Sequence, residues 1–444
     1  MPTAAFYTLG CKVNQCESAA LAGAFAAAGF AITQPSEPAD VYVINSCTVT
    51  STGDKKSLQA LRRFRRQNPR AIIALCGCLP QAFPEKAASV PEADIVLGTK
   101  NRASVLEAVQ ILLEGKSGRL VDIPAHGGAG EEEFERLPAS HPTERTRAFL
   151  KIQDGCEREC SYCIIPKARG PLRSRLPADI ITELEAFIAA GYKEVVLSGV
   201  NLGCYGHDLG LSLIDAVRTA CEIPGLTRIR LGSIEPDLLD EAAVAALKSH
   251  SDKLCDQFHL PLQSGCDKTL ARMRRPYTTG DYHRVVELLR EAFPGCAITT
   301  DIMTGFPGES EHEHSATLAF IQEVGFARAH IFCYSPRPGT PAAELPEQVP
   351  PQTAARRAGE ITELTTSSRQ EFLRSRVGKT HPVLFEVSKD GVSHGHTPCY
   401  THVRVSVHGD LSNQILPVCI IASEGAGCVG RVAPDAPANS TQPL

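Results

Sequence analysis

Short apolar segments alternate with helical stretches along most of this chain, and this alternation limits the folds that it can adopt. In the first part the expected strands are residues 4–9, 41–45, 71–75 and 94–97, and helical stretches such as 17–28 and 57–67 lie between them. A strand-to-strand period of this length is typical of βαβ units. We therefore predict a parallel α/β sheet for this part of the chain.

The alternation resumes after residue 147 with further strand–helix repeats. The expected strands are residues 148–153, 194–198, 228–231, 257–260, 297–302 and 328–332, and the expected helices are residues 178–190, 211–221, 237–249, 279–292 and 310–324. A closed barrel of this kind has eight repeats, so the six found here predict an incomplete (β/α)6 barrel. Polar and glycine residues follow the strands, and that face of a barrel carries its active site.

The remaining chain changes character twice. Residues 350–375 predict a charged helix, and residues 381–387, 400–407 and 414–422 alternate or run apolar between turns, which predicts a small all-β, barrel-like module. The predicted fold class is α/β. Its expected segments are an N-terminal sheet domain (1–113), a linker without a significant strand (114–142), a partial barrel (143–375), the β module (376–433) and a disordered tail (434–444).

The composition is that of a globular protein. Of 444 residues, 43% are hydrophobic and 21% are charged, which excludes a disordered chain. The net charge of −5 excludes a polycation, so any contact with nucleic acid must come from local basic patches. We see no signal peptide at the start and no apolar stretch of membrane-spanning length, so a cytoplasmic protein without membrane contact is expected.

The 17 cysteines are unusual for such a chain. Thiols stay reduced in the cytoplasm, and an odd number fits poorly with a closed disulfide framework. Binding of metal or a catalytic role is therefore favoured for some of them, while others serve as small buried apolar residues.

Three cysteines follow the first three long strands: Cys11, Cys47 and Cys78. The carboxyl ends of parallel strands meet at one edge of a sheet, where ligands bind. These thiols are therefore predicted to converge on a metal site, with three unrelated core cysteines as the alternative. Cys16 and Cys76 are rival ligands, although Cys76 should point to the opposite side of its strand from its neighbours.

A second group, Cys156-x3-Cys160-x2-Cys163, lies in the loop after the first barrel strand. Three thiolates hold three irons of a 4Fe–4S cluster and leave the fourth iron free. That iron can bind S-adenosylmethionine, which an electron from the cluster splits to a 5′-deoxyadenosyl radical. Zinc is the alternative, but a structural zinc site needs four ligands, and no fourth cysteine or histidine lies nearby. These three cysteines are thus the predicted catalytic residues.

Four segments resemble the radical S-adenosylmethionine methylthiotransferase family: residues 8–15, 45–49, 76–81 and 151–175. The resemblance extends over residues 3–432, and the β module resembles the TRAM domain of that family. It implies two 4Fe–4S clusters, one held by Cys156, Cys160 and Cys163 and an auxiliary one held by Cys11, Cys47 and Cys78. One S-adenosylmethionine would methylate a sulfur at the auxiliary cluster, and a second would generate the radical.

The resemblance also implies roles for residues around the predicted cleft. Tyr162 would flank the adenine of S-adenosylmethionine, Ser233 and Glu235 would bind its ribose, and Gln263 would line the same cleft. Ordinary packing and surface turns are the alternatives. A further group would neutralise a carboxylate or phosphate, with a solvated basic face as the alternative: Arg169, Arg173 and Arg175.

Two observations concern the substrate. Residues 55–70 hold seven basic residues and no acid, and Arg272, Arg274 and Arg275 form a second basic group; both patches would attract RNA, unless they are only solvated surface. Residues 376–444 carry five basic and five acidic residues, so the β module would bind RNA through shape or local contacts.

The start of the chain around Cys11 resembles the branch of the family that acts on threonylcarbamoyladenosine beside the anticodon of tRNA. This implies a 2-methylthio product, the anticodon loop as partner, a sulfur source, and an electron donor such as flavodoxin or ferredoxin. Three alternatives stay open: isopentenyladenosine in tRNA, a ribosomal protein side chain, and a non-catalytic iron–sulfur sensor.

Overall fold

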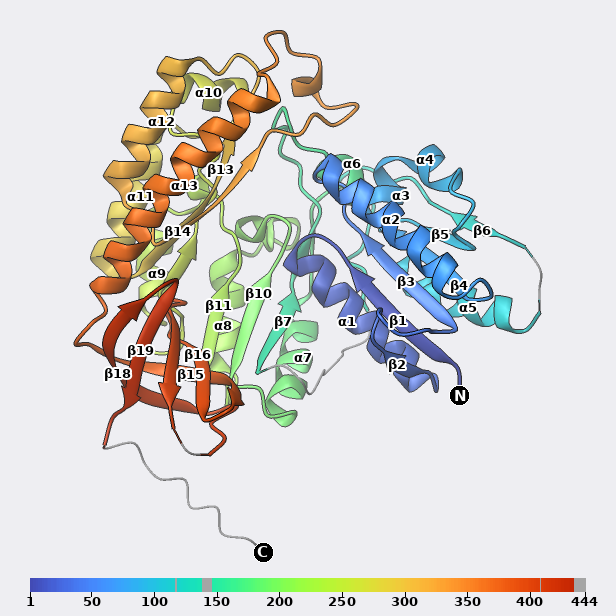
Figure 1. The fold of residues 1–444 in the computed structure, drawn as a ribbon, viewed down its shortest axis with the longest axis horizontal. Helices are drawn as coiled ribbons and strands as arrows, with labels where there is room; N and C mark the ends of the chain where they lie inside the picture. The colour runs from blue at the N-terminus through green and yellow to red at the C-terminus, as the bar shows by residue number, and fades with distance from the viewer. Residues whose placement is uncertain (116–117, 138–145, 408, 435–444) are drawn as a thin grey trace, which may run out of the picture.

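The N-terminal part is a parallel sheet with helices on both faces (Figure 1). The computed structural model describes residues 1–115, 118–137, 146–407 and 409–434. Across the sheet the strands are β2 (Ala31–Thr33), β1 (Thr3–Thr8), β3 (Val41–Ser46), β4 (Ile72–Gly77), β5 (Ile95–Leu97) and β6 (Leu120–Asp122), all paired in parallel. The predicted α/β class is confirmed for this part.

The helices bury their apolar stripes on the two faces of this sheet. One face is covered by α1 (Lys12–Ala27) and α5 (Val105–Leu113), and the other by α2 (Ser51–Gln67) and α4 (Pro84–Ala88). The helix α2 begins where the Thr50 side chain accepts a hydrogen bond from the Gly53 amide at 3.2 Å, which satisfies a free helix-end donor. Its Phe64 stacks on Tyr42 of β3 with ring centres 4.3 Å apart, so the helix is fixed on the sheet.

The expectation that the linker contains no significant strand is wrong. Leu120–Asp122 forms β6, which pairs with β5 at the sheet edge. This strand has three residues, two of them exposed, so it lacks the apolar run that makes the equally short β5 recognisable. The following segment is held by Glu135, which pairs with Arg102 at 2.6 Å, and by Glu132, which pairs with Arg173 at 2.8 Å. The predicted boundary at residues 142–143 lies outside the described residues.

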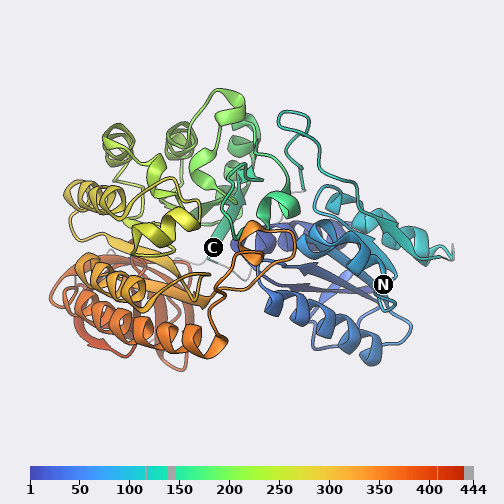
Figure 2. The same ribbon diagram turned by 90° about the horizontal axis from the view of Figure 1, so that it is seen from above.

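The central part is an open barrel of parallel strands with its helices outside (Figure 2). Its strands are β7 (Arg147–Lys151), β10 (Glu194–Ser198), β11 (Arg228–Leu231), β12 (Gln257–His259), β13 (Ala297–Thr304) and β14 (Arg328–Cys333). Two groups of three strands are joined by parallel bridges from Ile229 to Leu254 and from Ser233 to His259. All six expected strands are present in the expected order, and the incomplete barrel is confirmed.

Helices between these strands pack against one continuous apolar core. They are α7 (Pro177–Ala189), α8 (Leu213–Glu222), α9 (Glu241–Lys248), α11 (Thr279–Ala292) and α12 (Glu311–Val324). Shorter elements lie at the carboxyl ends of the strands: the antiparallel pair β8 (Gln153–Asp154) and β9 (Arg173–Ser174), and the helices α3 (Cys78–Ala82), α6 (Ile165–Arg169) and α10 (Asp267–Arg272). These short elements position the site described below.

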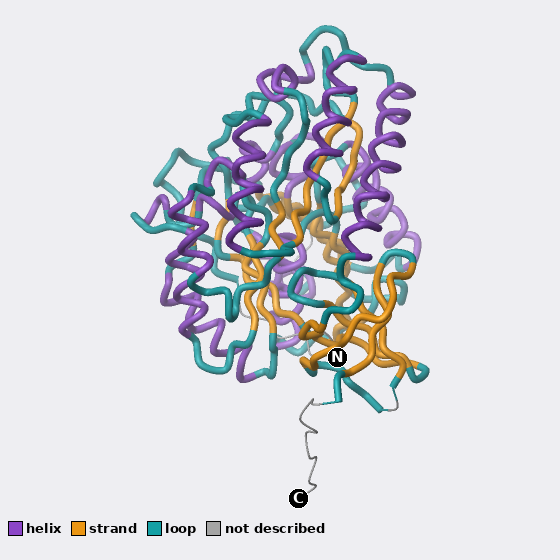
Figure 3. Tube along the Cα trace, turned by 90° about the vertical axis from the view of Figure 1, so that its left-hand side faces the viewer, coloured by secondary structure: helices purple, strands orange, loops and turns teal. Residues whose placement is uncertain are grey.

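The long helix α13 (Pro351–Arg374) leads into a small closed barrel at one end of the molecule (Figure 3). Its strands are β15 (Thr380–Lys389), β16 (Val392–His396), β17 (His402–Ser406), β18 (Ile415–Glu424) and β19 (Gly427–Val432). The expected strand at residues 400–407 begins later because Tyr400 has a left-handed φ of 61°. Residues 435–444 of the predicted tail lie outside the described residues.

Within the described residues, the structure has no helix that is both long and apolar enough to cross a membrane.

Candidate active site

The three strand-end cysteines lie at one edge of the N-terminal sheet. Gly10, just before Cys11, has a φ of +99°, and a Cβ atom there would lie 2.8 Å from Cβ and 2.9 Å from Sγ of Cys47. The Cys47 side chain therefore packs directly against the loop that carries Cys11. Cys78 begins the helix α3 after the neighbouring strand, and each of the three thiols lies within electrostatic range of the others.

The two rival cysteines have different surroundings. Cys76 is fully buried in the apolar core between α1 and the sheet, as the alternation along its strand predicts. The Sγ atom of Cys16 lies 3.6 Å from the Ser198 hydroxyl at the end of β10. Cys16 is also close enough to Cys11 for their charges to interact, but its thiol contacts Ser198 of β10. Cys78 interacts in this way with both Cys11 and Cys47, which favours it as the third ligand.

The structure reveals a residue in this group that the sequence alone does not single out. The side-chain amide of Asn14 donates to the carbonyl of Leu9 at 2.7 Å and to that of Ser46 at 3.1 Å. Asn14 is fully buried and thus joins the ends of β1 and β3, directly beside Cys11 and Cys47. A buried asparagine in the first turn of a helix is the signal that points to it.

The second cysteine group lies on a tightly built loop. Gly155 has a φ of +72°, and a Cβ atom there would lie 1.7 Å from the carbonyl oxygen of Pro171, so only glycine fits before Cys156. The Cys156 amide donates to the Gly170 carbonyl at 3.1 Å. All three sulfur-bearing residues, Cys156, Cys160 and Cys163, line a cavity of about 570 Å³.

Two side chains donate hydrogen bonds to these thiols. The guanidinium of Arg275 donates to Sγ of Cys160 at 3.3 Å, and the Asn201 amide contacts Sγ of Cys156 at 3.8 Å. Burial raises the pKa of Cys156, and it raises that of Cys163 to about 12. Metal binding to these two thiols must therefore release protons at neutral pH.

The donor set of this loop fits an iron–sulfur cluster. It offers three thiols around one cavity, with N–H donors directed at two of the sulfurs. Within the described residues, no three His, Cys, Asp or Glu side chains are placed to hold one metal ion together. In a 4Fe–4S cluster each cysteine binds a different iron, so its ligands do not need to meet at one ion.

The residues predicted to bind S-adenosylmethionine lie around the same loop. Tyr162 packs against Phe306, and its hydroxyl lies 3.5 Å from Arg275. Glu235 is in an ion pair with Arg275. Ser233 follows β11 and is half-buried, as part of the bridge to β12.

Gln263 is the predicted residue that most suggests a ligand. Its backbone has a left-handed φ of 66°, it is 8% exposed, and its buried side-chain oxygen has no hydrogen-bond partner in the described part of the chain. The side-chain oxygen of Asn201 is likewise buried and has no hydrogen-bond partner among the described residues. Buried acceptors of this kind are costly unless a bound molecule or water satisfies them.

The interpretation of Arg169, Arg173 and Arg175 as a solvated basic face is wrong. All three form ion pairs within the chain: Arg169 with Glu17, Arg173 with Glu132 and Arg175 with Glu183. They do neutralise carboxylates, but those of the protein itself. The local charge pattern could not reveal these ion pairs, because two of the three carboxylate partners, Glu17 and Glu132, are distant in sequence.

The second basic group is largely neutralised as well. Arg272 pairs with Glu313 at 2.7 Å, and Arg275 pairs with Glu235. Only Arg274 of the three stays exposed, beside the cavity of the cysteine loop.

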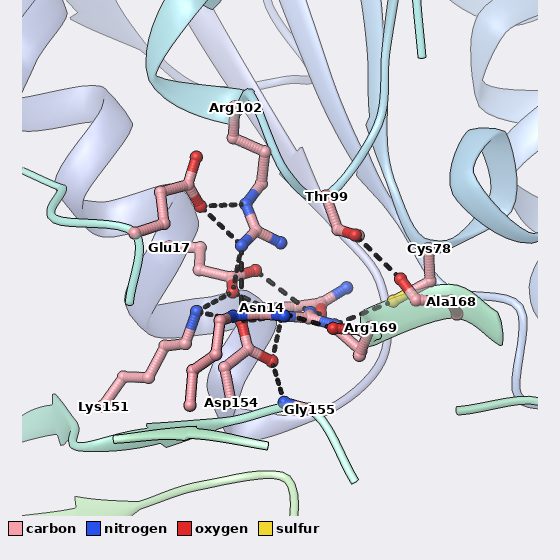
Figure 4. A network of polar contacts seen from close by, with 12 residues as sticks. Asn14, Glu17, Cys78, Thr99, Arg102, Lys151, Asp154, Gly155, Ala168 and Arg169 are labelled. Carbon is pink, nitrogen blue, oxygen red and sulfur yellow. Dashed lines mark hydrogen bonds and ion pairs between the residues drawn. The ribbon is translucent and has the colours of Figure 1, made fainter. Parts of the chain in front are cut away.

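A buried ion network joins the two cysteine regions (Figure 4). Glu17 of α1 accepts from Arg169 at 2.5 Å, from Lys151 at 2.8 Å and from Arg102 at 3.0 Å. Lys151 also contacts Asp154 at 2.5 Å. The Glu17 and Arg102 side chains are fully buried, and those of Arg169 and Asp154 are 1% exposed. The network therefore fixes the N-terminal sheet on the barrel.

The electrostatics of this network keep both carboxylates ionised. Burial alone would raise the pKa of Glu17, but Arg102, Arg169 and Lys151 lower it to about 2. Burial opposes ionisation of Asp154 in the same way, and Lys151, Arg169 and Arg102 hold its pKa well below the usual value.

Fold and site together define a class of enzyme, because a partial barrel with three cysteines after its first strand is the architecture of radical S-adenosylmethionine enzymes. The Radical SAM superfamily model matches residues 150–321, and the model described as "Uncharacterized protein family UPF0004" matches residues 3–98. A solved methyltransferase of that class, TsrM from Kitasatospora setae, shares the fold with a TM-score of 0.57 at 14% identity, over 89% of this chain and 81% of that one.

Curated relatives narrow the class further. The threonylcarbamoyladenosine tRNA methylthiotransferase MtaB of Bacillus subtilis is 38% identical over 433 residues, which is 95% of this chain and 94% of that protein. A tRNA-2-methylthio-N(6)-dimethylallyladenosine synthase from Pelotomaculum thermopropionicum is 35% identical over 95% of both chains. The chain belongs to the radical S-adenosylmethionine methylthiotransferase family and is an enzyme of the MtaB-like type.

Replacing Glu17 by Gln should destabilise the protein by about 3–5 kcal/mol at neutral pH, because buried cations lose their partner. The pKa of Glu17 is about 2 in the folded protein and 4.5 for an ordinary glutamate. Its charge therefore stabilises the fold fully at pH values above 4.5, and this stabilisation is lost as the pH falls towards about 2. The difference in urea unfolding free energy between wild type and Glu17→Gln should thus shrink between about pH 5 and about pH 3.

Exposed Glu107 of α5 provides the matched control, and Glu107→Gln should change little at either pH. An equally large effect of Glu17→Gln at both pH values would contradict the role given to its charge.

Proposed function

We propose that this enzyme inserts a methylthio group at carbon 2 of N6-threonylcarbamoyladenosine beside the anticodon of tRNA. The observation that carries the proposal is the pair of cysteine groups on facing loops, joined by one buried ion network. One group serves radical formation, and the other gives the sulfur a place next to it. The branch-specific name of the B. subtilis relative supports the nucleoside.

Each cysteine group has its own task. Cys156, Cys160 and Cys163 would hold the first 4Fe–4S cluster, and Cys11, Cys47 and Cys78 an auxiliary one. When bound, these clusters supply the electron that splits S-adenosylmethionine and the iron that holds the sulfur to be transferred. The protein would hold the two clusters on either side of the interface that Arg169 crosses.

The side chains around the first group would bind the cosubstrate. Tyr162 would flank its adenine, while Ser233 and Glu235 would bind its ribose hydroxyls. The unsatisfied side-chain oxygen of Gln263 would accept a further hydrogen bond.

The overall reaction breaks the carbon 2–hydrogen bond of the adenine ring. One S-adenosylmethionine would be reduced to 5′-deoxyadenosine and methionine, and would thereby take up the hydrogen and the two electrons released when the carbon–sulfur bond forms. A second S-adenosylmethionine would provide the methyl group. A reduced flavodoxin or ferredoxin would supply the electron that starts the cleavage, and a sulfur source would restore the sulfur.

Two surfaces support an RNA substrate. Lys55, Lys56, Arg62, Arg63 and Arg66 are exposed along α2. Arg65 is used in an ion pair with Asp94, and Arg62 lies 3.5 Å from Glu92. Basic surface of this kind attracts the phosphate backbone.

The second surface is a groove of about 410 Å³ between β14, α13 and the small barrel. Cationic and aromatic side chains gather there: Arg328, Arg369, Arg404, His396, His402 and Tyr400. Glu424 also lines the groove and pairs with Arg404, so Arg328 and Arg369 are its main cations. The small barrel is neutral as a whole, so this local grouping is what would bind RNA. A tRNA substrate would also place the enzyme in the cytoplasm.

Nucleoside mass spectrometry of tRNA tests the substrate. A strain without this protein should lose the 2-methylthio derivative of threonylcarbamoyladenosine and accumulate the unmodified nucleoside. The wild-type protein should restore it, and Cys156→Ala should not. Loss of the isopentenyladenosine derivative instead, or unchanged tRNA with an altered ribosomal protein, would refute the proposed substrate.

Cysteine variants test the two clusters. The anaerobically reconstituted protein should contain about eight irons per chain, from two four-iron clusters. Replacing Cys156, Cys160 and Cys163 by Ala should halve the iron and abolish 5′-deoxyadenosine formation.

The corresponding replacement of Cys11, Cys47 and Cys78 should also halve the iron, but it should spare 5′-deoxyadenosine formation and stop sulfur insertion. Full iron content in this second variant would rule out the auxiliary site.

Replacing Lys55, Arg62 and Arg66 by Ala should weaken tRNA binding and lower the salt dependence. The slope of log affinity against log salt should fall by about 2–3, because each lost phosphate contact removes roughly 0.7–0.9. Filter binding at several salt concentrations measures this. Exposed Arg284 of α11 offers the control, and Arg284→Ala should leave the slope unchanged. An unchanged slope in the triple variant would show that α2 is only solvated surface.

A further inference from the structure

Arg169 places a buried guanidinium against a thiol of the other domain. It lies at the end of α6, six residues after Cys163, and is 1% exposed. Its Nε atom donates to Sγ of Cys78 at 3.3 Å across the domain interface (Figure 4). The barrel part thus reaches directly into the region of the auxiliary cysteines.

The rest of the guanidinium binds the framework around the other two auxiliary cysteines. Its Nη2 atom donates to the side-chain oxygen of Asn14, whose amide in turn binds the carbonyls of Leu9 and Ser46. One arginine therefore contacts Cys78 directly and, through Asn14, the residues that precede Cys11 and Cys47.

The same side chain is fixed from the radical loop. Its Nη1 atom contacts Asp154 at 3.3 Å, and Oδ1 of Asp154 accepts from the Gly155 amide at 2.9 Å, next to Cys156. Glu17 binds the same nitrogen at 2.5 Å. These partners leave the guanidinium little freedom to move, so its N–H direction towards sulfur is preset.

We propose that Arg169 is a positioning residue that stabilises the reduced form of the auxiliary cluster through its hydrogen bond to the Cys78 sulfur. This inference rests on the auxiliary cluster of the proposed function. Arginine keeps its charge at any accessible pH. A fixed cation and N–H donor at a ligand sulfur favours the more negative, reduced cluster, and hydrogen bonds to the sulfurs are a main determinant of cluster potentials.

A comparable contact exists in the first group, where Arg275 donates to Cys160, also at 3.3 Å. The two arginines belong to separate ion networks: Arg275 pairs with Glu235, and Arg169 with Glu17 and Asp154. A change at Arg169 leaves the hydrogen bond between Arg275 and Cys160 in place, but Arg169 also contacts Asp154 beside the radical loop. The test therefore removes the first cluster.

The experiment uses the full-length chain with Cys156, Cys160 and Cys163 replaced by Ala, so that only the auxiliary cluster contributes a signal. Arg169→Gln and Arg169→Lys are introduced, and iron content and the midpoint potential are measured by anaerobic redox titration with electron paramagnetic resonance. Arg102→Lys is the matched control, because Arg102 lies in the same buried network and contacts no cysteine.

Arg169→Gln should shift the equilibrium about tenfold towards the oxidised cluster, which corresponds to a potential lower by about 59 mV for one electron. Arg169→Lys keeps the charge but not the directed N–H, so its potential should lie between that of Arg169→Gln and the parent. Arg102→Lys should leave the potential unchanged.

Potentials of both Arg169 variants equal to that of Arg102→Lys would overturn the inference. If Arg169→Gln does not retain iron, Arg169→Lys decides by the same comparison. If the parent protein without the radical cysteines holds no iron, the auxiliary cluster does not exist, and the inference fails with it. If the parent holds iron but the Arg169 variants do not shift the potential, only the inference fails.

Discussion

The placement of the active site depends on two carboxylates, Glu17 and Asp154, that lie buried between domains. A buried carboxylate is tolerated only when cations surround it, and here these come from both sides: Arg102 from the N-terminal part, Lys151 and Arg169 from the barrel. Neither domain alone supplies all the cations that surround these two carboxylates. Docking of the sheet on the barrel and satisfaction of these charges are therefore one event, and that event brings the two cysteine groups to opposite sides of one interface.

Parallel strands explain why cysteines from distant segments meet at this interface. Both parts of the enzyme are built from βα repeats, whose strand ends collect loops at one edge. The loops approach closely only where a side chain is absent. Gly10 leaves room for Cys47, and Gly155 leaves room for the carbonyl of Pro171. These two glycines are as necessary to the site geometry as the cysteines themselves.

Much of this arrangement could be predicted from the sequence. The elements β10 and α11 lie at the predicted residues. β10 is a short apolar run between polar residues, and α11 has a clear helical periodicity of its apolar residues. The strands β2 and β6 were missed because they are short edge strands with exposed residues, whereas β5, of the same length, is a fully buried apolar run. The Arg169–Asn14 contact joins residues 155 positions apart, and no local pattern encodes such a pair. For the same reason the charge pattern around Arg169 could not decide between neutralising a carboxylate and a solvated surface, because its carboxylate partner Glu17 is distant in sequence.

The small barrel is fixed to the catalytic part by buried polar contacts. Arg230 of β11 pairs with Glu194 at 2.8 Å and donates to the Pro398 carbonyl at 2.6 Å. Tyr400 lies against the guanidinium groups of both Arg147 and Arg230, at 4.9 and 4.7 Å. Tyr400 also lines the basic groove, so these contacts fix the groove relative to the barrel strands. The surface proposed for RNA therefore has a defined position next to the amino ends of β7 and β14, where Arg147 and Arg328 lie.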